Sequence, residues 1–557
     1  MEKIETYEVA SKELLVSVNI NKSSKGTNIY ELIRPKLHPA TKALLDEIKI
    51  ELITEVNISG AEILDIKEID HIKERFKTKA KEMLKKKLQN LPDKTSEVLI
   101  GILIQDMLGL GELEPLLSDE NLEEIVINSS TEAVRVYHKK YGWLETNITL
   151  TSEPQIKNYS SIIARRAGRQ ITTLTPLLDA YLPTGDRVNA VLHPISGKGH
   201  TITIRKFARD PWTMTDFINN KTCSAEIFSL IWLCIQYEMS ILISGGTASG
   251  KTSFLNVIMP FIPENQRLLS IEDTREIQLP SSLYWCPLTT REPNPEGKGG
   301  VTMLDLLVNS LRMRPDRIIF GEIRKKEQAE VLFEALHTGH SIYSTVHADS
   351  IGETIRRLVN PPINLPANLL SAVNLNVVMF RDRRKGIRRV LQVGELVDAE
   401  GELISIKPNL LFRWKPDIDQ IIKHNEPIKL YEDLSKYTGM TLVEIKKDLA
   451  NKKKLLDLMV KNNFRTVEEV GSIIRNYYLN PKYDANKIIN MVKNEQREEK
   501  EVQIKKSNIN ITKEIKTTQK PIKKLPERLK IKKLNTKKLH RKIKKSNIKK
   551  TKKKRGR

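Results

Sequence analysis

The chain has 557 residues and a formal net charge of +24, a length that predicts several domains because one hydrophobic core rarely organises so many residues. It contains no run of 18 apolar residues, and its three cysteines (Cys223, Cys234 and Cys286) form no C-x-x-C pair. These features argue against a membrane span, a disulfide framework and a thiolate zinc site, and they favour a protein of the reducing cytoplasm.

The predicted elements differ along the first part of the chain. Residues 1–95 show helical periodicity and few turn signals after Pro39, which predicts a mainly helical N-terminal region. Residues 96–218 mix short helical stretches with alternating patterns at 133–137, 188–192 and 201–205. Such alternation is typical of half-buried strands, so an α+β domain is expected here.

Residues 219–400 alternate apolar strand patterns with helical periods, which predicts a parallel sheet wound with helices. Residues 401–490 carry apolar residues at helical spacing and predict a helical C-terminal region. The overall fold class is therefore α/β, with an α+β domain ahead of the wound sheet.

Residues 491–557 are expected to be a disordered, Lys/Arg-rich tail. Between 501 and 557, 24 Lys and Arg residues stand against three Glu, and the last aromatic residue of the chain is Tyr483. Such a segment cannot bury enough apolar surface to offset its ordering entropy. We expect electrostatic attachment to an anionic membrane surface; a solubilising or partner-docking extension is the alternative.

One stretch carries a complete G-x-x-x-x-G-K-[ST] phosphate loop. Its members are Gly245, Gly246, Thr247, Ala248, Ser249, Gly250, Lys251 and Thr252. An apolar strand pattern (239–244) precedes it, and a helical pattern (253–259) that Pro260 ends follows it. Backbone N–H groups of such a loop surround phosphate oxygens, the lysine reaches the β- and γ-phosphates, and the threonine hydroxyl binds Mg²⁺. ATP and Mg²⁺ are therefore the expected cofactors; the alternative is a glycine-rich connecting turn.

Three later stretches place polar groups beside apolar strand patterns. Residues 269–276 end in an acidic cluster that contains Glu272 and Glu276. A β-branched pattern at 317–320 leads to Glu322, and His340 and His347 bracket the pattern at 341–346. Because parallel strands bind ligands at their carboxyl ends, these groups are candidates for a hydrolytic site around the phosphate loop.

Together these stretches resemble the type II/type IV secretion ATPase superfamily. The phosphate loop, IEDTRE (271–276), LRMRPDRIIFGEIR (311–324) and TGHSIYSTVHA (338–348) are similar to its Walker A, Asp, Walker B and His boxes. Upstream, VYHKKYGWLETNI, PLLDAYLPTGDRVNAVL and TITIRKF look like the N-terminal domain of archaeal members, and LLFRWKPDIDQ and VEEVGSIIRNYYLNPK continue the likeness downstream. The resemblance covers roughly residues 25–485.

This resemblance implies a RecA-like ATPase domain and a homo-hexameric motor that is peripheral to the cytoplasmic membrane. Such motors drive filament assembly or secretion through a polytopic membrane platform protein. The implied residue roles are water activation by Glu272, with Glu276 as its rival, and Mg²⁺ support by Thr252 and Glu322. His340 and His347 would contact the γ-phosphate side, and Arg187 and Arg205 would reach the nucleotide from the N-terminal domain.

Two departures and two alternatives accompany the resemblance. Lys325 stands where relatives commonly have Gly, and the four-cysteine zinc insertion of many bacterial members is absent. A RecA-like nucleic-acid translocase is the alternative enzyme class, because the basic tail could bind polyphosphate. Without interleaved aromatic residues the tail predicts no specific nucleic-acid partner. A non-catalytic nucleotide-gated scaffold would require a missing carboxylate, whereas Glu272, Glu276 and Glu322 are all present.

Overall fold

The structure, a computed structural model, describes residues 2–495 and 497, apart from residues 12–13, 23–25, 27, 36, 56–67, 89–90, 183, 208–210, 292, 294–296, 383, 399–405 and 481–483. The chain divides into a unit spanning Met1–Val492 and a second that begins at Lys493. The tail prediction for residues 501–557 lies outside the described residues.

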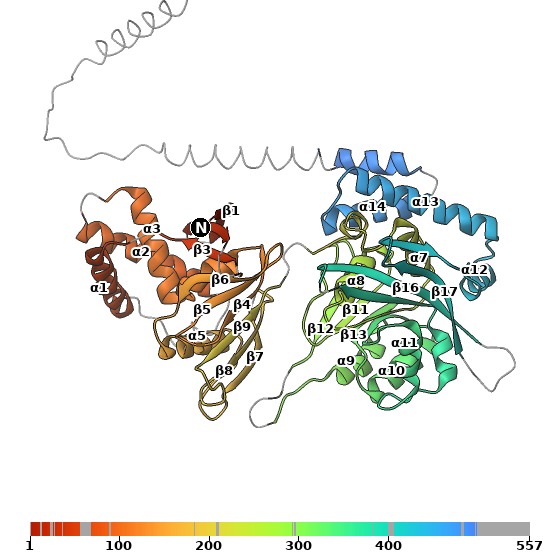
Figure 1. Cartoon of the computed structure of the whole chain (residues 1–557), viewed down its shortest axis with the longest axis horizontal. Helices are drawn as coiled ribbons and strands as arrows, with labels where there is room; N and C mark the ends of the chain where they lie inside the picture. Colours follow the sequence, from red (N-terminus) through yellow and green to blue (C-terminus); the bar gives the residue numbers. More distant parts are fainter. Residues whose placement is uncertain are drawn as a thin grey trace, which may run out of the picture. The chain divides into compact units, whose positions relative to one another are not determined.

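The first sheet has nine strands in the order β1-β2-β3-β6-β5-β4-β9-β8-β7 (Figure 1). Their bounds are β1 Glu2–Ser11, β2 Leu14–Lys22, β3 Ile29–Ile33, β4 Leu122–Ile127, β5 Ala133–His138, β6 Gly142–Thr149, β7 Leu177–Tyr181, β8 Arg187–Val191 and β9 Thr201–Arg205. All neighbours are antiparallel except β3 and β6. The predicted strands at 133–137, 188–192 and 201–205 are thus confirmed as β5, β8 and β9.

The prediction of a mainly helical region over residues 1–95 is wrong for its first third, where β1, β2 and β3 form the edge of this sheet. The physical reason is visible in β2, whose Leu14, Val16, Val18 and Ile20 alternate and are all buried. A period of two buries one face of a strand, whereas a helix would scatter these side chains around its axis.

Helices follow these strands. α1 (Pro39–Glu55), α2 (Glu68–Lys87) and α3 (Asp93–Leu108) share a separate hydrophobic cluster, in which Ile48, Phe76 and Leu103 are buried. Of the lysines of α2, Lys81, Lys85 and Lys86 are exposed and the others are half-buried. Shorter helices, η2 (Gly111–Leu113), α4 (Glu114–Ser118) and α5 (Glu153–Arg166), pack on the sheet through residues such as Leu113, Leu116 and Ile156.

The second sheet also has nine strands, in the order β12-β11-β13-β14-β10-β15-β16-β17-β18. The six from β12 to β15 are parallel, and the last three continue the sheet antiparallel. Their bounds are β10 Ile241–Gly245, β11 Leu268–Glu272, β12 Trp285–Thr289, β13 Arg317–Glu322, β14 Ser341–Val346, β15 Leu375–Asp382, β16 Ile387–Asp398, β17 Ile406–Lys415 and β18 Gln420–Lys423. The predicted wound parallel sheet is confirmed.

Helices cover both faces of this sheet (Figure 1). Ile241 and Ile243 of β10 belong to the cluster on one face, while Leu242 belongs to the cluster on the other. This double burial explains why β10 is a continuous apolar pattern and not an alternating one. The helices are α6 Met214–Asn219, α7 Ala225–Gln236, α8 Lys251–Ile258, η3 Met259–Phe261, α9 Met303–Ser310, η4 Leu311–Met313, α10 Lys326–His337, α11 Ile351–Val359 and η5 Ala367–Ala372.

The prediction of a helical region over residues 401–490 is correct for α12 (Lys429–Thr438), α13 (Leu442–Lys461) and α14 (Val467–Leu479). It is wrong for β17 and β18, which extend the sheet. Leu411, Phe412 and Trp414 of β17 are buried. Aromatic side chains such as Phe412 and Trp414 favour the pleated surface of a strand, which is the physical reason for a strand here.

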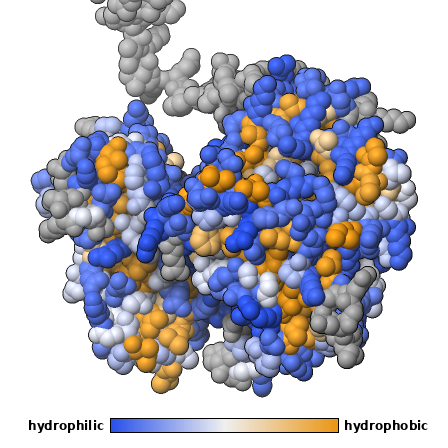
Figure 2. All heavy atoms as spheres, turned by 45° about the vertical axis from the view of Figure 1, so that its right-hand side comes forward, coloured by the Kyte–Doolittle hydropathy of each residue, from blue (hydrophilic) through white to orange (hydrophobic). Residues whose placement is uncertain are grey.

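No helix among the described residues is long and apolar enough to span a membrane. On the face shown in Figure 2, hydrophobic patches lie among hydrophilic residues. Several large apolar side chains are highly exposed. They include Leu174 in the domain built on the first sheet (the first domain), and Tyr437 and Val443 around the start of α13.

Candidate functional site

The phosphate loop connects the carboxyl end of β10 to the N-terminus of α8. Gly245 has φ 152°, Ala248 φ 59° and Gly250 φ 95°, so the backbone curls between strand and helix. A Cβ built on Gly245 would lie 2.5 Å from the carbonyl oxygen of Met379 and 2.5 Å from Ser249 Oγ. Both the conformation and the space therefore require glycine at this position.

Lys251 folds back over the loop. Its ammonium donates to the carbonyl oxygens of Gly245 and Gly246, each at 3.0 Å. Burial lowers the pKa of Lys251, and the negative charges of Glu322 and Asp349 act in the opposite direction. The ammonium thus lies within the electrostatic influence of two carboxylates at the mouth of the loop.

Glu272, the last residue of β11, is buried. One carboxylate oxygen, Oε1, accepts hydrogen bonds from the backbone N–H groups of Glu276 (2.9 Å) and Ile277 (3.1 Å). The other, Oε2, is buried and has no hydrogen-bond partner among the described residues. Burial raises the pKa of Glu272 to about 7, although the two backbone bonds oppose that shift. Glu276 is half-buried and contributes its backbone to this turn.

Glu322 ends β13 and is held by an arginine two residues later. Arg324 donates from Nε to Glu322 Oε2 at 2.9 Å, and its Nη1 lies 2.9 Å from Asp273 Oδ2. Arg324 therefore links the Walker B and Asp-box stretches. Lys325 is extended (φ −119°, ψ 154°) at the start of α10, a conformation open to any residue, so the departure from Gly has no backbone cost here.

The two histidines lie at opposite ends of β14. His347 follows the strand, and its Nε2 lies 2.8 Å from Thr247 Oγ1 of the phosphate loop. His340 precedes the strand and contacts Thr338 Oγ1 and the Ala335 carbonyl, each at 3.2 Å. The six residues of β14 span about 20 Å, so one chain does not bring His340 to its own phosphate loop.

Arg187 and Arg205 are direct neighbours in the first sheet, because β8 and β9 pair them in register. Both are exposed. The Arg187 guanidinium donates to both carboxylate oxygens of Asp179, at 3.1 and 2.6 Å. They form a pair of cations on the first domain, separate in the chain from the phosphate loop.

Two residues that contact the phosphate loop, Asp349 and Arg388, were not identified from the sequence. Asp349 lies against the loop: its Oδ1 would be 2.9 Å from a Cβ at Gly246. Arg388 of β16 donates from Nε to the Ala248 carbonyl at 3.3 Å. Asp349 directly follows the His box (338–348), which is a local signal. Arg388 lies 140 residues from Ala248, and only the pairing of β15 with β10 and β16 brings it close.

These residues fit a magnesium–nucleotide complex. The loop offers an α-helix N-terminus, a lysine and a threonine hydroxyl, and the buried oxygen of Glu272 lacks a partner. Glu322 lies two strands from β10, at the same edge of the sheet. Oxygen donors and a phosphate cradle are the groups that such a complex requires.

The part of the chain that contains this site matches a known protein family. Residues 108–382 match the family model described as type II/IV secretion system protein. An uncharacterized protein of Methanocaldococcus jannaschii is 38% identical over 400 residues, which cover 70% of this chain and 71% of that protein. The type IV secretion system protein PtlH of Bordetella pertussis is 30% identical over 313 residues, 50% of this chain and 91% of that protein.

Among solved structures, the VirB11 ATPase of the Brucella suis type IV secretion system is 26% identical to this chain, with a TM-score of 0.26. The match covers 51% of this chain and 93% of that protein. The family match includes the phosphate loop, Glu272, Glu322 and both histidines.

Proposed function

Because the chain belongs to the type II/IV secretion system protein family, we propose that it is an ATP-hydrolysing motor that powers assembly of a type IV pilus-like filament or protein secretion. The observation that carries this proposal is the gathering of Lys251, Glu322 and His347 around one phosphate loop, with the buried Glu272 at the same sheet edge. A loop that only bound nucleotide would not need a carboxylate with a raised pKa beside it.

The nucleotide phosphates lie on the loop N–H groups, and Lys251 moves from the Gly245 and Gly246 carbonyls to phosphate oxygens. Thr252 and Glu322 would hold Mg²⁺, and the ion would supply positive charge against the phosphate oxygens of the nucleotide. Glu272 orients the attacking water and accepts its proton, because its oxygen Oε2 is the unpartnered one. Glu276 remains the rival for this role.

His347 orients the loop through Thr247 and senses the γ-phosphate side. Arg187 and Arg205 supply positive charge to a nucleotide when the first domain closes on an ATPase domain, in a homo-hexamer. An assembly of this kind acts at the cytoplasmic membrane with a polytopic platform protein as partner. The predicted contact of His340 with the γ-phosphate side stays a prediction, because within one chain His340 lies away from the phosphate loop.

Phosphate release by the purified full-length protein tests this proposal. Lys251→Ala should abolish ATP binding and turnover, whereas Lys326→Ala, an exposed lysine of α10, should retain both. An active Lys251→Ala protein would contradict the assigned site.

The basic segment 501–557 leaves a nucleic-acid translocase as the second candidate. The same assay separates the two functions. Stimulation of ATPase activity by vesicles of anionic lipid supports the membrane motor. Saturable stimulation by single-stranded DNA, without an effect of lipid, supports the translocase.

A further inference from the structure

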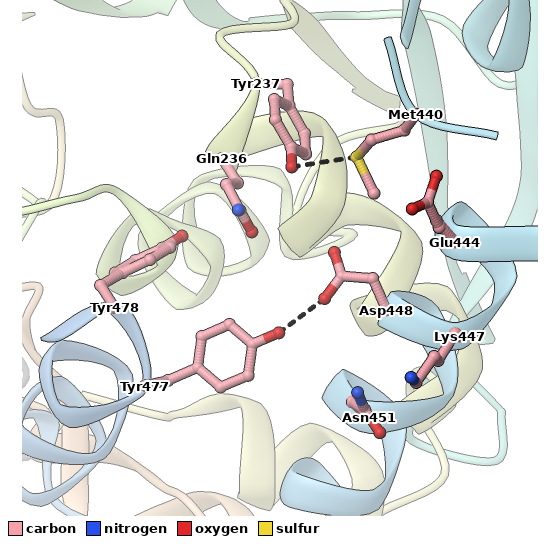
Figure 3. Close-up of a pocket in the computed structure, with 9 residues that line it drawn as sticks. All are labelled: Gln236, Tyr237, Met440, Glu444, Lys447, Asp448, Asn451, Tyr477 and Tyr478. Atoms are coloured by element: carbon pink, nitrogen blue, oxygen red, sulfur yellow. Dashed lines mark hydrogen bonds between the residues drawn. The ribbon is translucent and has the colours of Figure 1, made fainter. Parts of the chain in front are cut away.

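A pocket of about 340 Å³ opens among the end of α7, the first turns of α13 and the end of α14 (Figure 3). Its lining includes Gln236, Glu444, Asp448, Tyr477 and Tyr478. Gln236 lies five residues before β10, at the edge of the sheet opposite the phosphate loop. The five residues of β10 span about 17 Å, so this pocket is distinct from the nucleotide site.

Several hydrogen-bond acceptors in this pocket have capacity for further donors. Oε1 of Gln236 is buried and has no hydrogen-bond partner among the described residues. Asp448 accepts from the Tyr477 hydroxyl at 2.6 Å and pairs with Lys452. Oε2 of Glu444 accepts from Thr441, and its other oxygen is not used in that cap. A carboxylate oxygen has two lone pairs, so acceptor capacity remains at both acids.

The wall of the pocket already stabilises one buried cation. The Lys452 ammonium is fully buried behind Asp448, 5.1 Å from the Tyr477 ring centroid and 5.6 Å from that of Trp232. Aromatic faces attract cations through the ring quadrupole, and this attraction grows when water is excluded. Tyr477 and Tyr478 present further ring surface to the pocket itself.

Two further features favour a positive ligand. α7 ends at Gln236 and α14 ends at Leu479, so two helix C-termini with their partial negative charge lie at the pocket, against the single N-terminus of α13. Glu444 and Asp448 line it together with one lysine, Lys447, which lies beside Asn451 in Figure 3. Lys452 compensates Asp448 from behind, and Lys447 opposes the charge of Glu444. The attraction for a cation therefore comes from the unpartnered acceptor of Gln236, the helix C-termini and the aromatic rings.

We propose that this pocket receives an arginine side chain from a partner protein. A guanidinium offers five N–H donors in a plane and stacks on aromatic rings, which matches the unpartnered acceptor of Gln236, the carboxylates of Glu444 and Asp448 and the two tyrosines. A protein partner is favoured over a free small cation because Tyr437 and Val443, beside the lining residues Met440 and Glu444, expose apolar surface. The arginine is therefore expected among aliphatic residues of the partner segment.

The probe is the peptide acetyl-Ala-Leu-Arg-Leu-Ala-amide, titrated into the full-length protein by calorimetry. Two matched peptides replace arginine by citrulline, its neutral isostere, and by lysine. We expect the arginine peptide to bind at least tenfold more tightly than the citrulline peptide and severalfold more tightly than the lysine peptide, since only the guanidinium supplies both charge and a planar set of donors.

Three variants locate the binding. Glu444→Gln should weaken the arginine peptide severalfold, and Gln236→Glu should tighten it by adding a carboxylate at the unpartnered acceptor. Glu432→Gln, an exposed acid of α12 that does not line the pocket, is the control and should change nothing. The gain expected of Gln236→Glu cannot result from misfolding.

Equal binding of the arginine and citrulline peptides would overturn the proposal, because the surface would then recognise apolar residues only. Unchanged affinity in both Glu444→Gln and Gln236→Glu would overturn the location. Concentration-dependent self-association of the wild-type protein that Glu444→Gln abolishes would show that the occupant is a second copy of this chain, and this too would overturn the partner assignment.

Discussion

Nε2 of His347 lies 2.8 Å from the hydroxyl of Thr247, so the residue that follows β14 is in direct contact with the phosphate loop. This contact joins two neighbouring parallel strands at their carboxyl edge. A displacement of Thr247 in the loop therefore reaches the end of β14 through one side-chain pair.

The first prediction concerns this pair. His347→Ala should lower kcat for ATP hydrolysis about 10- to 100-fold while changing nucleotide affinity less, since the loop and Lys251 remain. Steady-state kinetics with a fluorescent-nucleotide titration measure both quantities. His337→Ala, an exposed histidine at the end of α10, is the matched control. An equal loss in the control would point to the fold and not to the loop contact.

The second prediction separates Glu272 from Glu276. Glu272→Gln should reduce kcat about 10²- to 10⁴-fold and leave ATP binding intact, whereas Glu276→Gln should reduce it far less. If Glu276→Gln is the inactive variant and Glu272→Gln turns over normally, the assignment within the Asp box is wrong.

The pH profile gives a third prediction from the same carboxyl group. Burial raises the pKa of Glu272 to about 7, so the basic form is lost as pH falls through 7 and kcat should fall with it. The contribution of Glu272 to stability has the opposite sense: it is present below the ordinary carboxyl pKa and is lost as pH rises through 7. Glu272→Gln should therefore be at least as stable as wild type at pH 8, measured by chemical denaturation.

The fourth prediction uses two glycines. Gly245→Ala should destabilise the protein by about 1–3 kcal/mol and weaken nucleotide binding, because its Cβ would lie 2.5 Å from the Met379 carbonyl oxygen. Gly352→Ala, within α11, meets no atom within 4 Å and should be neutral or stabilising by up to about 1 kcal/mol. Denaturant midpoints compare the two, and similar losses in both would contradict the steric explanation.

A fifth prediction concerns the buried ammonium of Lys452. Burial lowers its pKa to about 8, although Asp448 opposes the shift. Between pH 8 and the ordinary lysine pKa the unfolded chain binds more protons at this group, so its contribution to stability rises with pH. Lys452→Met should remove this rise, which denaturation at pH 7.5 and 9.5 would reveal as a smaller difference between the two pH values than in wild type. An unchanged difference would mean that Lys452 stays charged in the folded protein.

The sequence by itself determined the local features of this protein. The phosphate loop, β10 and α8 could be located because glycine, lysine and threonine at fixed spacing have few other uses between a buried strand and a helix. Glu272 and Glu322 were found because each ends an apolar strand pattern. β1, β2 and β3 were not identified from the sequence as strands of the first sheet, nor β17 and β18 as strands of the second. The alternation in β2 was a local signal for a strand, whereas the parallel pairing of β3 with β6 joins residues far apart in the chain.

Only the tertiary structure decided which of the candidate side chains meet. His340 and His347 are similar in sequence context, yet the direction of β14 places one at the loop and the other at the opposite edge. Arg388 reaches Ala248 through an antiparallel strand added to the parallel sheet, a connection between residues 140 positions apart. The raised pKa of Glu272 is likewise a property of its burial, which is set by the packing of the whole sheet.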